Sequence, residues 1–276
     1  MRGILLFIAA IFALASPAAA APPQRVMSIN LCTDQLALLL LPPERIASVS
    51  WLARDPALSA MAAAAARVPA NHGASEEVLR ARPDLVLAGT FTTRATVETL
   101  RALGAPLVDI APAESWADIR ATTRAVAAAV GATARAEMLL ARMDATLAGL
   151  AARRAKQTHR PLVAFWSGPG LAPGAGTLSD AVVEAAGEDN LARKLGIVGF
   201  GSLDAERLIL AAPDLLITAE ATPAPSLRSQ AATHPAIRDR WRGRMLSVPE
   251  ALTSCGGPFT ADAAVELNLQ IARLSP

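Results

Sequence analysis

One twelve-residue unit occurs twice in this chain and constrains its fold more than any other feature. Residues 76–87 read EEVLRARPDLVL and residues 206–217 read ERLILAAPDLLI, and the two align without a gap. Each copy is typical of a short helix, a break at proline and an apolar strand, because proline cannot continue a helix. Since the copies lie in different halves of the chain, we expect two similar α/β units.

The segments around both copies continue this alternation of strand and helix. Strands that alternate with helices form parallel sheets with helices on both faces. We therefore expect an N-terminal lobe over residues 24–130 and a C-terminal lobe over residues 159–276. The further strands are expected at 25–30, 45–50, 161–166 and 244–248, and the further helices at 35–41, 179–186 and 261–274.

A long helix is expected between the lobes, over residues 131–158. Residues 132–157 contain no proline and a single glycine, and their leucines and methionines recur at helical spacing. A helix of this length would span ~39 Å at ~1.5 Å per residue, which suits a rigid connection between two lobes. The alternative is an ordinary long domain helix with two shorter helices beside it.

The N-terminus is predicted to be a secretory signal peptide, residues 1–20. Arg2 is followed by the apolar stretch 3–15 and then by the small residues of 16–20. The apolar stretch is too short to cross the hydrocarbon core of a membrane as a helix, and the small residues are typical of a cleavage site. We expect an exported periplasmic protein; an uncleaved membrane anchor is the alternative.

Charge and motifs exclude several classes of function. The chain has 26 basic and 24 acidic residues, a net charge of +2, and no run of Lys or Arg longer than two. Nucleic-acid binding therefore has no basic patch to support it. The G-x-S-x-G, H-E-x-x-H, P-loop and G-x-G-x-x-G motifs are missing from the sequence, so we expect no enzyme. An exported hydrolase with dispersed catalytic residues, or a sensor that serves another partner, remains as an alternative.

Eight segments, in this order and spacing, resemble the periplasmic solute-binding proteins of ABC importers for cobalamin, ferric siderophores and haem. They are RVMSINLCTDQLALLL from residue 25, IASVS with the following Trp51, EEVLRARPDLVLAG, LGAPLVDI, the long helix, LSDAVVEAAGEDNLA from 178, ERLILAAPDLLIT and HPAI. The resemblance implies an α/β fold of the class III architecture: two Rossmann-like lobes with parallel sheets, joined by one long rigid helix, with the ligand in the cleft between them.

Candidate ligand-binding residues follow from this architecture. In open α/β sheets ligands bind beyond the carboxyl ends of the strands, and a large flat macrocycle is held mainly by apolar and aromatic walls. The alternative is that the aromatic residues only fill gaps between helices and sheets. The candidates are Asn30, Cys32, Trp51, His72, Phe91, Trp166, Phe200, Cys255 and Phe259.

Three of these candidates have more than one interpretation. His72 is either an axial ligand to cobalt or iron, a donor to a side amide of the ligand, or a surface residue. Cys32 and Cys255 would border the same cleft, where they could form a disulfide that clamps the lobes, ligate a metal centre as thiolates, or stay unpaired. No resident metal site is expected, because the three histidines are dispersed.

The resemblance also implies the partners. In this family one glutamate on each lobe docks against arginines of the membrane permease, and the matching residues are Glu76 and Glu206; a plain helix-start carboxylate is the alternative, and Glu77 could replace Glu76. We expect a monomer that works with the permease and ATPase complex at the inner membrane. No cofactor is required, and the ligand is expected to be a corrinoid such as cobalamin, with a ferric siderophore next. Haem is less favoured because the chain has no tyrosine to ligate its iron.

Overall fold

The computed structural model describes residues 21–218, 230 and 234–274. The expected signal peptide, residues 1–20, lies outside these ranges. Within them, every helix is too short or too polar to cross a membrane.

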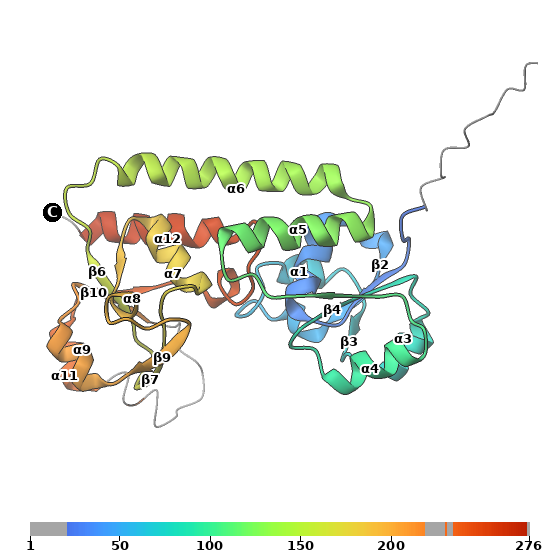
Figure 1. Ribbon diagram of the computed structural model, residues 1–276, viewed down its shortest axis with the longest axis horizontal. Helices are drawn as coiled ribbons and strands as arrows, with labels where there is room; N and C mark the ends of the chain where they lie inside the picture. Colours follow the sequence, from blue (N-terminus) through green and yellow to red (C-terminus); the bar gives the residue numbers. More distant parts are fainter. Residues whose placement is uncertain (1–20, 219–229, 231–233, 275–276) are drawn as a thin grey trace, which may run out of the picture.

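The N-terminal lobe is built on a parallel sheet in the strand order β3-β2-β1-β4-β5, flanked by helices (Figure 1). This confirms the parallel α/β lobe expected from the sequence. The strands are β1 (Val26–Ser28), β2 (Ile46–Ser50), β3 (Ala70–Asn71), β4 (Leu85–Gly89) and β5 (Leu107–Ile110). The helices are α1 (Leu31–Leu40), α2 (Ala62–Ala65), α3 (Ser75–Ala81) and α4 (Arg94–Ala102), with 3-10 turns at η1 (Pro43–Arg45) and η2 (Trp51–Arg54).

The C-terminal lobe has a second parallel sheet, in the order β11-β10-β6-β8. An antiparallel hairpin of β7 and β9 lies beside it, and β7 comes from the glycine- and proline-rich segment 167–176. The strands are β6 (Leu162–Phe165), β7 (Gly170–Pro173), β8 (Asp189–Asn190), β9 (Phe200–Leu203), β10 (Leu215–Thr218) and β11 (Met245–Ser247). The helices are α7 (Leu178–Ala186), α8 (Leu191–Lys194), α9 (Ala205–Ala211), α11 (Pro235–Arg240) and α12 (Thr260–Leu274), with a 3-10 turn at η3 (Glu250–Leu252).

Two antiparallel helices lead from one lobe to the other. Helix α5 (Trp116–Val130) ends at Gly131, whose φ of 67° allows a tight reversal into α6 (Thr133–Arg154). The 22 residues of α6 span about 33 Å, and the helix runs along both lobes, over α5 and then over α12 (Figure 1). The chain therefore passes between the lobes as a helix, which begins and ends within the expected range 131–158.

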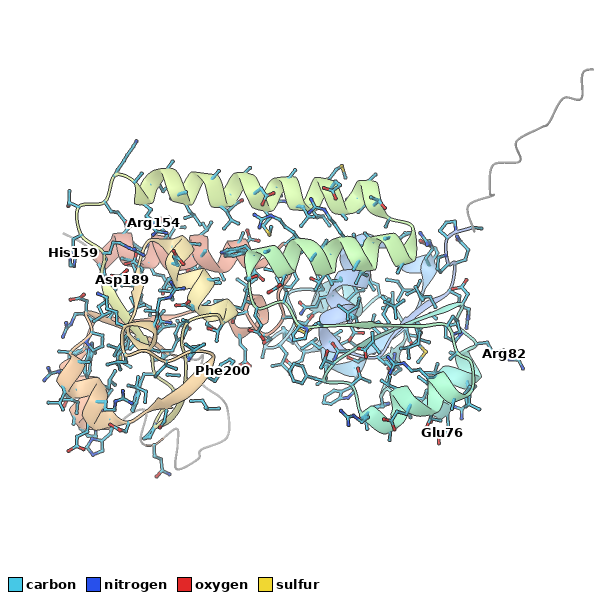
Figure 2. The ribbon with its side chains drawn as sticks, in the orientation of Figure 1. Glu76, Arg82, Arg154, His159, Asp189 and Phe200 are labelled. Atoms are coloured by element: carbon cyan, nitrogen blue, oxygen red, sulfur yellow. A yellow bond between two sulfur atoms is a disulfide. The ribbon has the colours of Figure 1, made fainter. Side chains whose placement is uncertain are left out.

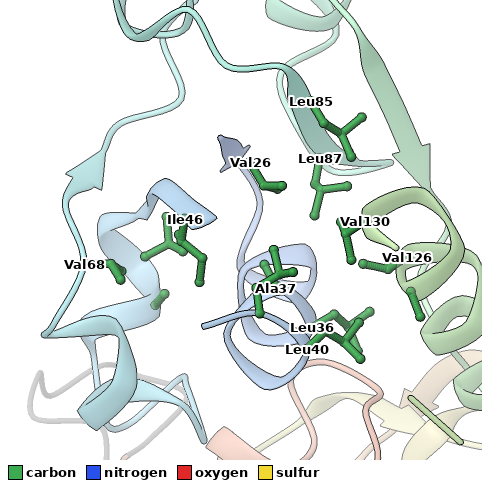
Figure 3. Close-up of a cluster of buried hydrophobic side chains, with 14 of the residues drawn as sticks. Val26, Leu36, Ala37, Leu40, Ile46, Val68, Leu85, Leu87, Val126 and Val130 are labelled. Carbon is green, nitrogen blue, oxygen red and sulfur yellow. The ribbon is translucent and has the colours of Figure 1, made fainter. Parts of the chain in front are cut away.

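Both faces of the N-terminal sheet are buried, as in parallel sheets generally. Val26, Leu85 and Leu87 point to one face, where they meet α1 and α5 (Figure 3). The alternate residues Val86 and Ala88 point to the other face, where they pack against apolar residues of α3 and α4. The continuous apolar runs of β4 and β10 thus reflect burial on two sides.

The repeated unit has the same backbone geometry in both lobes. Helices α3 and α9 end at Arg82 and Ala212, whose φ angles of 47° and 45° are left-handed. In the described part of the chain, these are the only residues other than glycine with positive φ. Each directly precedes the proline of its repeat, and a following proline disfavours the right-handed helical conformation. The two copies therefore share a backbone conformation as well as a sequence.

The aspartate of each repeat anchors the neighbouring strand. The Asp84 carboxylate accepts hydrogen bonds from the backbone N–H groups of Gln24 and Arg25, at 2.7 and 2.9 Å. The Asp214 carboxylate accepts one from the N–H of Leu162, at 2.7 Å. These contacts fix where β1 and β6 begin.

Candidate functional site

A cavity of about 150 Å3 lies between the two lobes. Its walls come from loops, from the first turns of α1 and α7, and from the start of β9. The N-terminal lobe contributes Cys32, Phe91, Pro112, Ala113 and Glu114, and the C-terminal lobe contributes Leu178, Ser179, Phe200, Thr253, Ser254, Cys255 and Gly256.

Two phenylalanines, one from each lobe, line this cavity. Phe91 follows β4 in the N-terminal lobe and is 79% exposed. Phe200 begins β9 in the C-terminal lobe and is 58% exposed (Figure 2). Val198, two positions before Phe200, is 80% exposed, and Leu171, on the partner strand β7 of the hairpin, is 64% exposed. Apolar side chains this exposed indicate a binding surface for a ligand with a flat apolar face.

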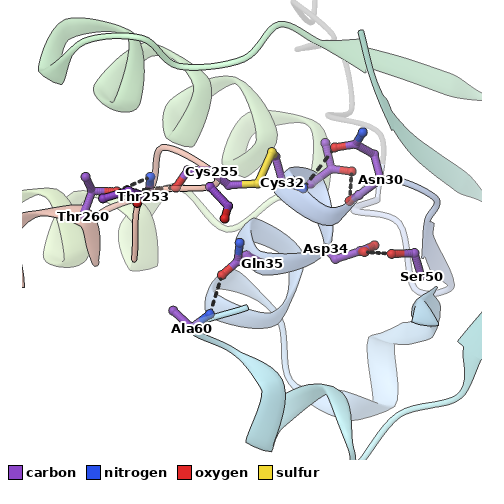
Figure 4. Close-up of a disulfide and its surroundings, with 12 residues drawn as sticks. Asn30, Cys32, Asp34, Gln35, Ser50, Ala60, Thr253, Cys255 and Thr260 are labelled. Atoms are coloured by element: carbon purple, nitrogen blue, oxygen red, sulfur yellow. Dashed lines mark hydrogen bonds between the residues drawn. A yellow bond between two sulfur atoms is a disulfide. The ribbon is translucent and has the colours of Figure 1, made fainter. Parts of the chain in front are cut away.

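A disulfide between Cys32 and Cys255 forms part of the cavity lining (Figure 4). Their Cα atoms are 5.1 Å apart, although the residues are 223 positions apart in sequence. Asn30 holds the Cys32 side of this link, because its Oδ1 accepts a hydrogen bond from the N–H of Cys32, at 3.0 Å, and caps α1. Both sulfurs belong to the disulfide, so neither is a free thiol or a thiolate ligand.

The polar groups of the cavity are mainly hydroxyls. Ser179, Thr253 and Ser254 line it, and Glu114 is the one ionisable side chain among the described lining residues. Across the described ranges, no three His, Cys, Asp or Glu side chains lie close enough to hold a metal ion. The site can therefore offer an apolar face and neutral hydrogen-bonding groups rather than a metal-binding cage.

Three further candidates lie around the carboxyl edge of the N-terminal sheet. Asn30 lines a smaller adjoining cavity together with Phe91. Trp51 follows β2 and is 52% exposed. His72 follows β3 with an exposed side chain, and its Nδ1 is 3.4 Å from Oε1 of Glu77. Neither Trp51 nor His72 lines the cavity between the lobes.

Two candidates lie away from the cavity, contrary to the expectation that they line it. Trp166 is 1% exposed and packs in the C-terminal core beside Leu203 and Leu216, because it shares the face of β6 on which Ala164 lies. Phe259 lies on the α6 side of the molecule, where it lines a different cavity. Chain position after a strand does not determine which way a side chain points.

The two glutamates that the resemblance assigns to docking occupy matching positions. Glu76 and Glu206 are exposed in the first turns of α3 and α9, and both helices lie on the side of the molecule opposite α6 (Figures 1 and 2). Glu77 is not equivalent to Glu76. Its Oε2 accepts hydrogen bonds from the N–H groups of His72, at 2.8 Å, and Ala74, at 3.2 Å, and these bonds lower the pKa of Glu77 against the opposing effect of burial.

Sequence reasoning missed a polar network beneath the cleft. Asp34 on α1 is fully buried, and burial raises the pKa of its carboxyl to about 6, against the lowering effect of hydrogen bonds from Ser28 and Ser50. The Ser50 hydroxyl contacts one Asp34 oxygen (Figure 4), and the Ser28 hydroxyl lies 2.8 Å from that of Thr33. An aspartate inside an apolar helix is the signal that could have revealed this network, which ties α1 to β1 and β2.

Comparison with known proteins identifies the group to which this architecture belongs. The family model described as periplasmic binding protein matches residues 26–233. A search of curated proteins finds no match.

Solved structures share the fold over nearly the whole chain. The apo periplasmic heme-binding protein RhuT from Roseiflexus sp. RS-1 is 25% identical, with a TM-score of 0.72, covering 91% of this chain and 98% of that one. The vitamin B12 binding protein BtuF of Vibrio cholerae is 16% identical, with a TM-score of 0.69, covering 92% and 98%. An Fe3+-hydroxamate transport protein of Saccharomonospora viridis is 17% identical, with a TM-score of 0.68, covering 91% and 93%.

The family match extends over most of the chain, from β1 of the N-terminal lobe to beyond β10 of the C-terminal lobe. The solved structures cover both lobes and the helix between them. This two-lobed chain belongs to the periplasmic binding protein family, with the fold of its heme-, cobalamin- and hydroxamate-binding members.

Proposed function

We propose that this protein is the solute-binding component of an ABC importer, and that it captures a corrinoid in the cavity between Phe91 and Phe200. It delivers the ligand to a permease and ATPase complex at the inner membrane and carries out no chemical reaction. The observation that supports this most directly is the pair of exposed phenylalanines facing one cavity from two lobes. The apolar faces of a corrin ring can stack on such side chains.

The charge of the lining favours a corrinoid over the other ligands of similar size. Haem carries two propionates and catecholate siderophores carry a high negative charge, and such groups are usually paired with Arg or Lys. The described lining has no basic side chain and one carboxylate, Glu114. The side amides of a corrin instead need neutral partners, which Ser179, Thr253 and Ser254 can supply. The absence of tyrosine from the sequence also removes one common ligand to haem iron.

Haem or a ferric chelate is the second candidate, because the solved structures that share this fold include heme-binding and hydroxamate-transport proteins. The visible spectrum of protein purified from its native periplasm separates the candidates, since corrin, haem and ferric chelates absorb at different wavelengths. Corrin bands would support the main proposal, and haem or ferric bands would replace it with the second.

Site variants test the position of the ligand. Phe91→Ala and Phe200→Ala should each weaken binding of cyanocobalamin at least about tenfold, because each removes a stacked ring. Leu103→Ala is the matched control, since Leu103 is 58% exposed at the far end of α4 and should leave binding unchanged. Full affinity in both phenylalanine variants would place the ligand elsewhere.

The docking role is proposed for Glu76 and Glu206. Carboxylates on the rim of an interface orient a partner more than they add affinity, and one on each lobe fixes how the cleft faces the permease. The double variant Glu76→Ala, Glu206→Ala should bind ligand normally but lose uptake in cells. Glu98→Ala, an exposed carboxylate on α4, is the control. Normal uptake by the double variant would refute the docking role.

A further inference from the structure

The loop that carries Cys255 rests directly on the N-terminal lobe. A Cβ atom on Gly256 would lie 2.7 Å from the Ala113 Cβ, 2.8 Å from the Ala113 carbonyl oxygen and 3.1 Å from Ile119 Cγ1. The first two atoms are the methyl carbon and the backbone carbonyl oxygen of Ala113, and neither can move away by a side-chain rotation. Glycine is therefore required here, because the two lobes meet with no space for a side chain.

The same loop is held in one shape from within. The N–H of Gly257 donates to Oγ1 of Thr260 at 3.1 Å, and the N–H of Thr260 donates to the carbonyl of Gly257 at 2.9 Å. On the other side of Cys255, the N–H of Ser254 donates to the carbonyl of Glu250 at 2.7 Å. A movement of Cys255 must therefore carry η3 and the start of α12 with it.

Behind this junction, the lobes share an apolar cluster. Ala113 and Ile119 of the N-terminal lobe pack with Leu178 and Ala261 of the C-terminal lobe, all less than a tenth exposed, and α6 covers them. The lobes thus touch through apolar packing under α6, and within the cavity they are joined covalently by the disulfide.

From this arrangement we propose that the Cys32–Cys255 disulfide and the Gly256 contact form a positioning element that sets the distance between the two phenylalanine walls. The disulfide lines the same cavity as both phenylalanines. Because it joins the lobes covalently there, the lobes can tilt about it but cannot separate at that point. The two phenylalanines therefore stay at the spacing that a bound ligand needs. The entropy of ordering them is lost when the protein folds and not when the ligand binds.

The first test measures the distance between the lobes without any ligand. Dyes are attached through non-natural residues at Glu98 on α4 and Leu210 on α9, both exposed, and energy transfer is recorded on single molecules. A dithiol such as dithiothreitol supplies two electrons, which convert the disulfide to two cysteine thiols while the dithiol becomes its own disulfide. Reduction, or the double variant Cys32→Ser, Cys255→Ser, should broaden the distance distribution.

Two glycine variants separate positioning from general damage to the fold. Gly256→Ala keeps the disulfide but forces the lobes apart at Ala113, so its mean interlobe distance should shift. Gly149→Ala on α6 has no atom within 4 Å of its new Cβ and should leave the interlobe distance unchanged. Circular dichroism confirms that each variant is folded. Unchanged distances in a folded double variant and in Gly256→Ala would overturn the proposal and leave the disulfide as a stabilising link only.

The second test uses ligand exchange and rests on the proposed function. In the double variant, cyanocobalamin should dissociate about tenfold faster, while its association rate changes less than about threefold, because loosened walls shorten the residence time. A lower melting temperature with an unchanged dissociation rate would contradict the proposal. If cyanocobalamin does not bind the unmodified protein, the corrinoid assignment fails, and the distance measurement alone decides the role of the disulfide.

Discussion

Glu188 is a buried carboxylate that gives a sharp prediction for stability against pH. The residue is 1% exposed between α7 and β8, and neither carboxylate oxygen has a hydrogen-bond partner in the described part of the chain. Arg160 donates instead to the Glu188 backbone carbonyl, at 2.7 Å, and pairs with Asp189. Burial raises the pKa of Glu188 to about 7; Arg160 opposes this, and the charges of Asp189 and Asp214 add to it.

The magnitude follows from the difference in pKa between the folded and unfolded chain. The carboxyl changes from 4.5 to about 7 on folding, which at ~1.36 kcal/mol per pKa unit gives an upper value of about 3.4 kcal/mol. Screening by solvent and side-chain relaxation reduce this to about 2 kcal/mol. Between pH 4.5 and 7 the folded state holds a proton that the unfolded state has lost, so the free energy of unfolding falls as pH rises through this window.

The substitution Glu188→Gln removes this dependence, because the amide is neutral at every pH and has almost the same shape. At pH 8 the variant should be more stable than the unmodified protein by about 2 kcal/mol, and the advantage should shrink toward zero or reverse at pH 5. Urea denaturation at unit steps between pH 5 and 8 measures the difference in the free energy of unfolding between the variant and the unmodified protein. The contributions of other titrating groups, such as Asp34, are the same in both proteins and cancel in this difference. A difference that stays constant with pH would refute a raised pKa at Glu188.

Three more predictions concern stability and are measured by urea denaturation. Loss of the disulfide, by Cys32→Ser with Cys255→Ser, should lower the free energy of unfolding by about 3–5 kcal/mol, because the link joins residues 223 positions apart in sequence. An unchanged free energy of unfolding would show that the link adds no stability. Trp241→Phe should cost about 1–2 kcal/mol, since the buried indole donates to the Pro213 carbonyl at 2.7 Å, and a cost near zero would contradict that bond. Gly149→Ala on exposed α6 should add about 0.5–1 kcal/mol by helix propensity, and a loss would contradict the open environment.

The sequence carried enough information to predict the two lobes and the matching helices α3 and α9. A proline and an aspartate at fixed spacing after a short helix dictate the same turn twice, as the left-handed residues Arg82 and Ala212 show. The aspartates then hold the neighbouring strands, so local chemistry alone determines how each unit begins. The left-handed turn and the aspartate hydrogen bonds both involve residues of the repeat itself, so the repeated sequence is enough to predict them.

The site was harder to predict, because it depends on contacts between distant segments. Trp166 follows a strand just as Phe91 does, but packing against Leu216 turns it into the core. Phe259 lies just before α12 and lines a cavity together with residues of α6 instead of the cavity between the lobes. The contact of Gly256 with Ala113 joins segments more than a hundred residues apart, and no local pattern in the sequence marks it.

The disulfide also turns most of the polypeptide into a closed ring. Every peptide bond from Cys32 to Cys255, including those of α3, α6 and α9, lies within this ring. A protease that cuts one of these bonds opens the ring without releasing a fragment, since the two ends stay attached through the sulfur link. In a compartment that contains proteases, a single cut therefore need not part the two halves of the binding site.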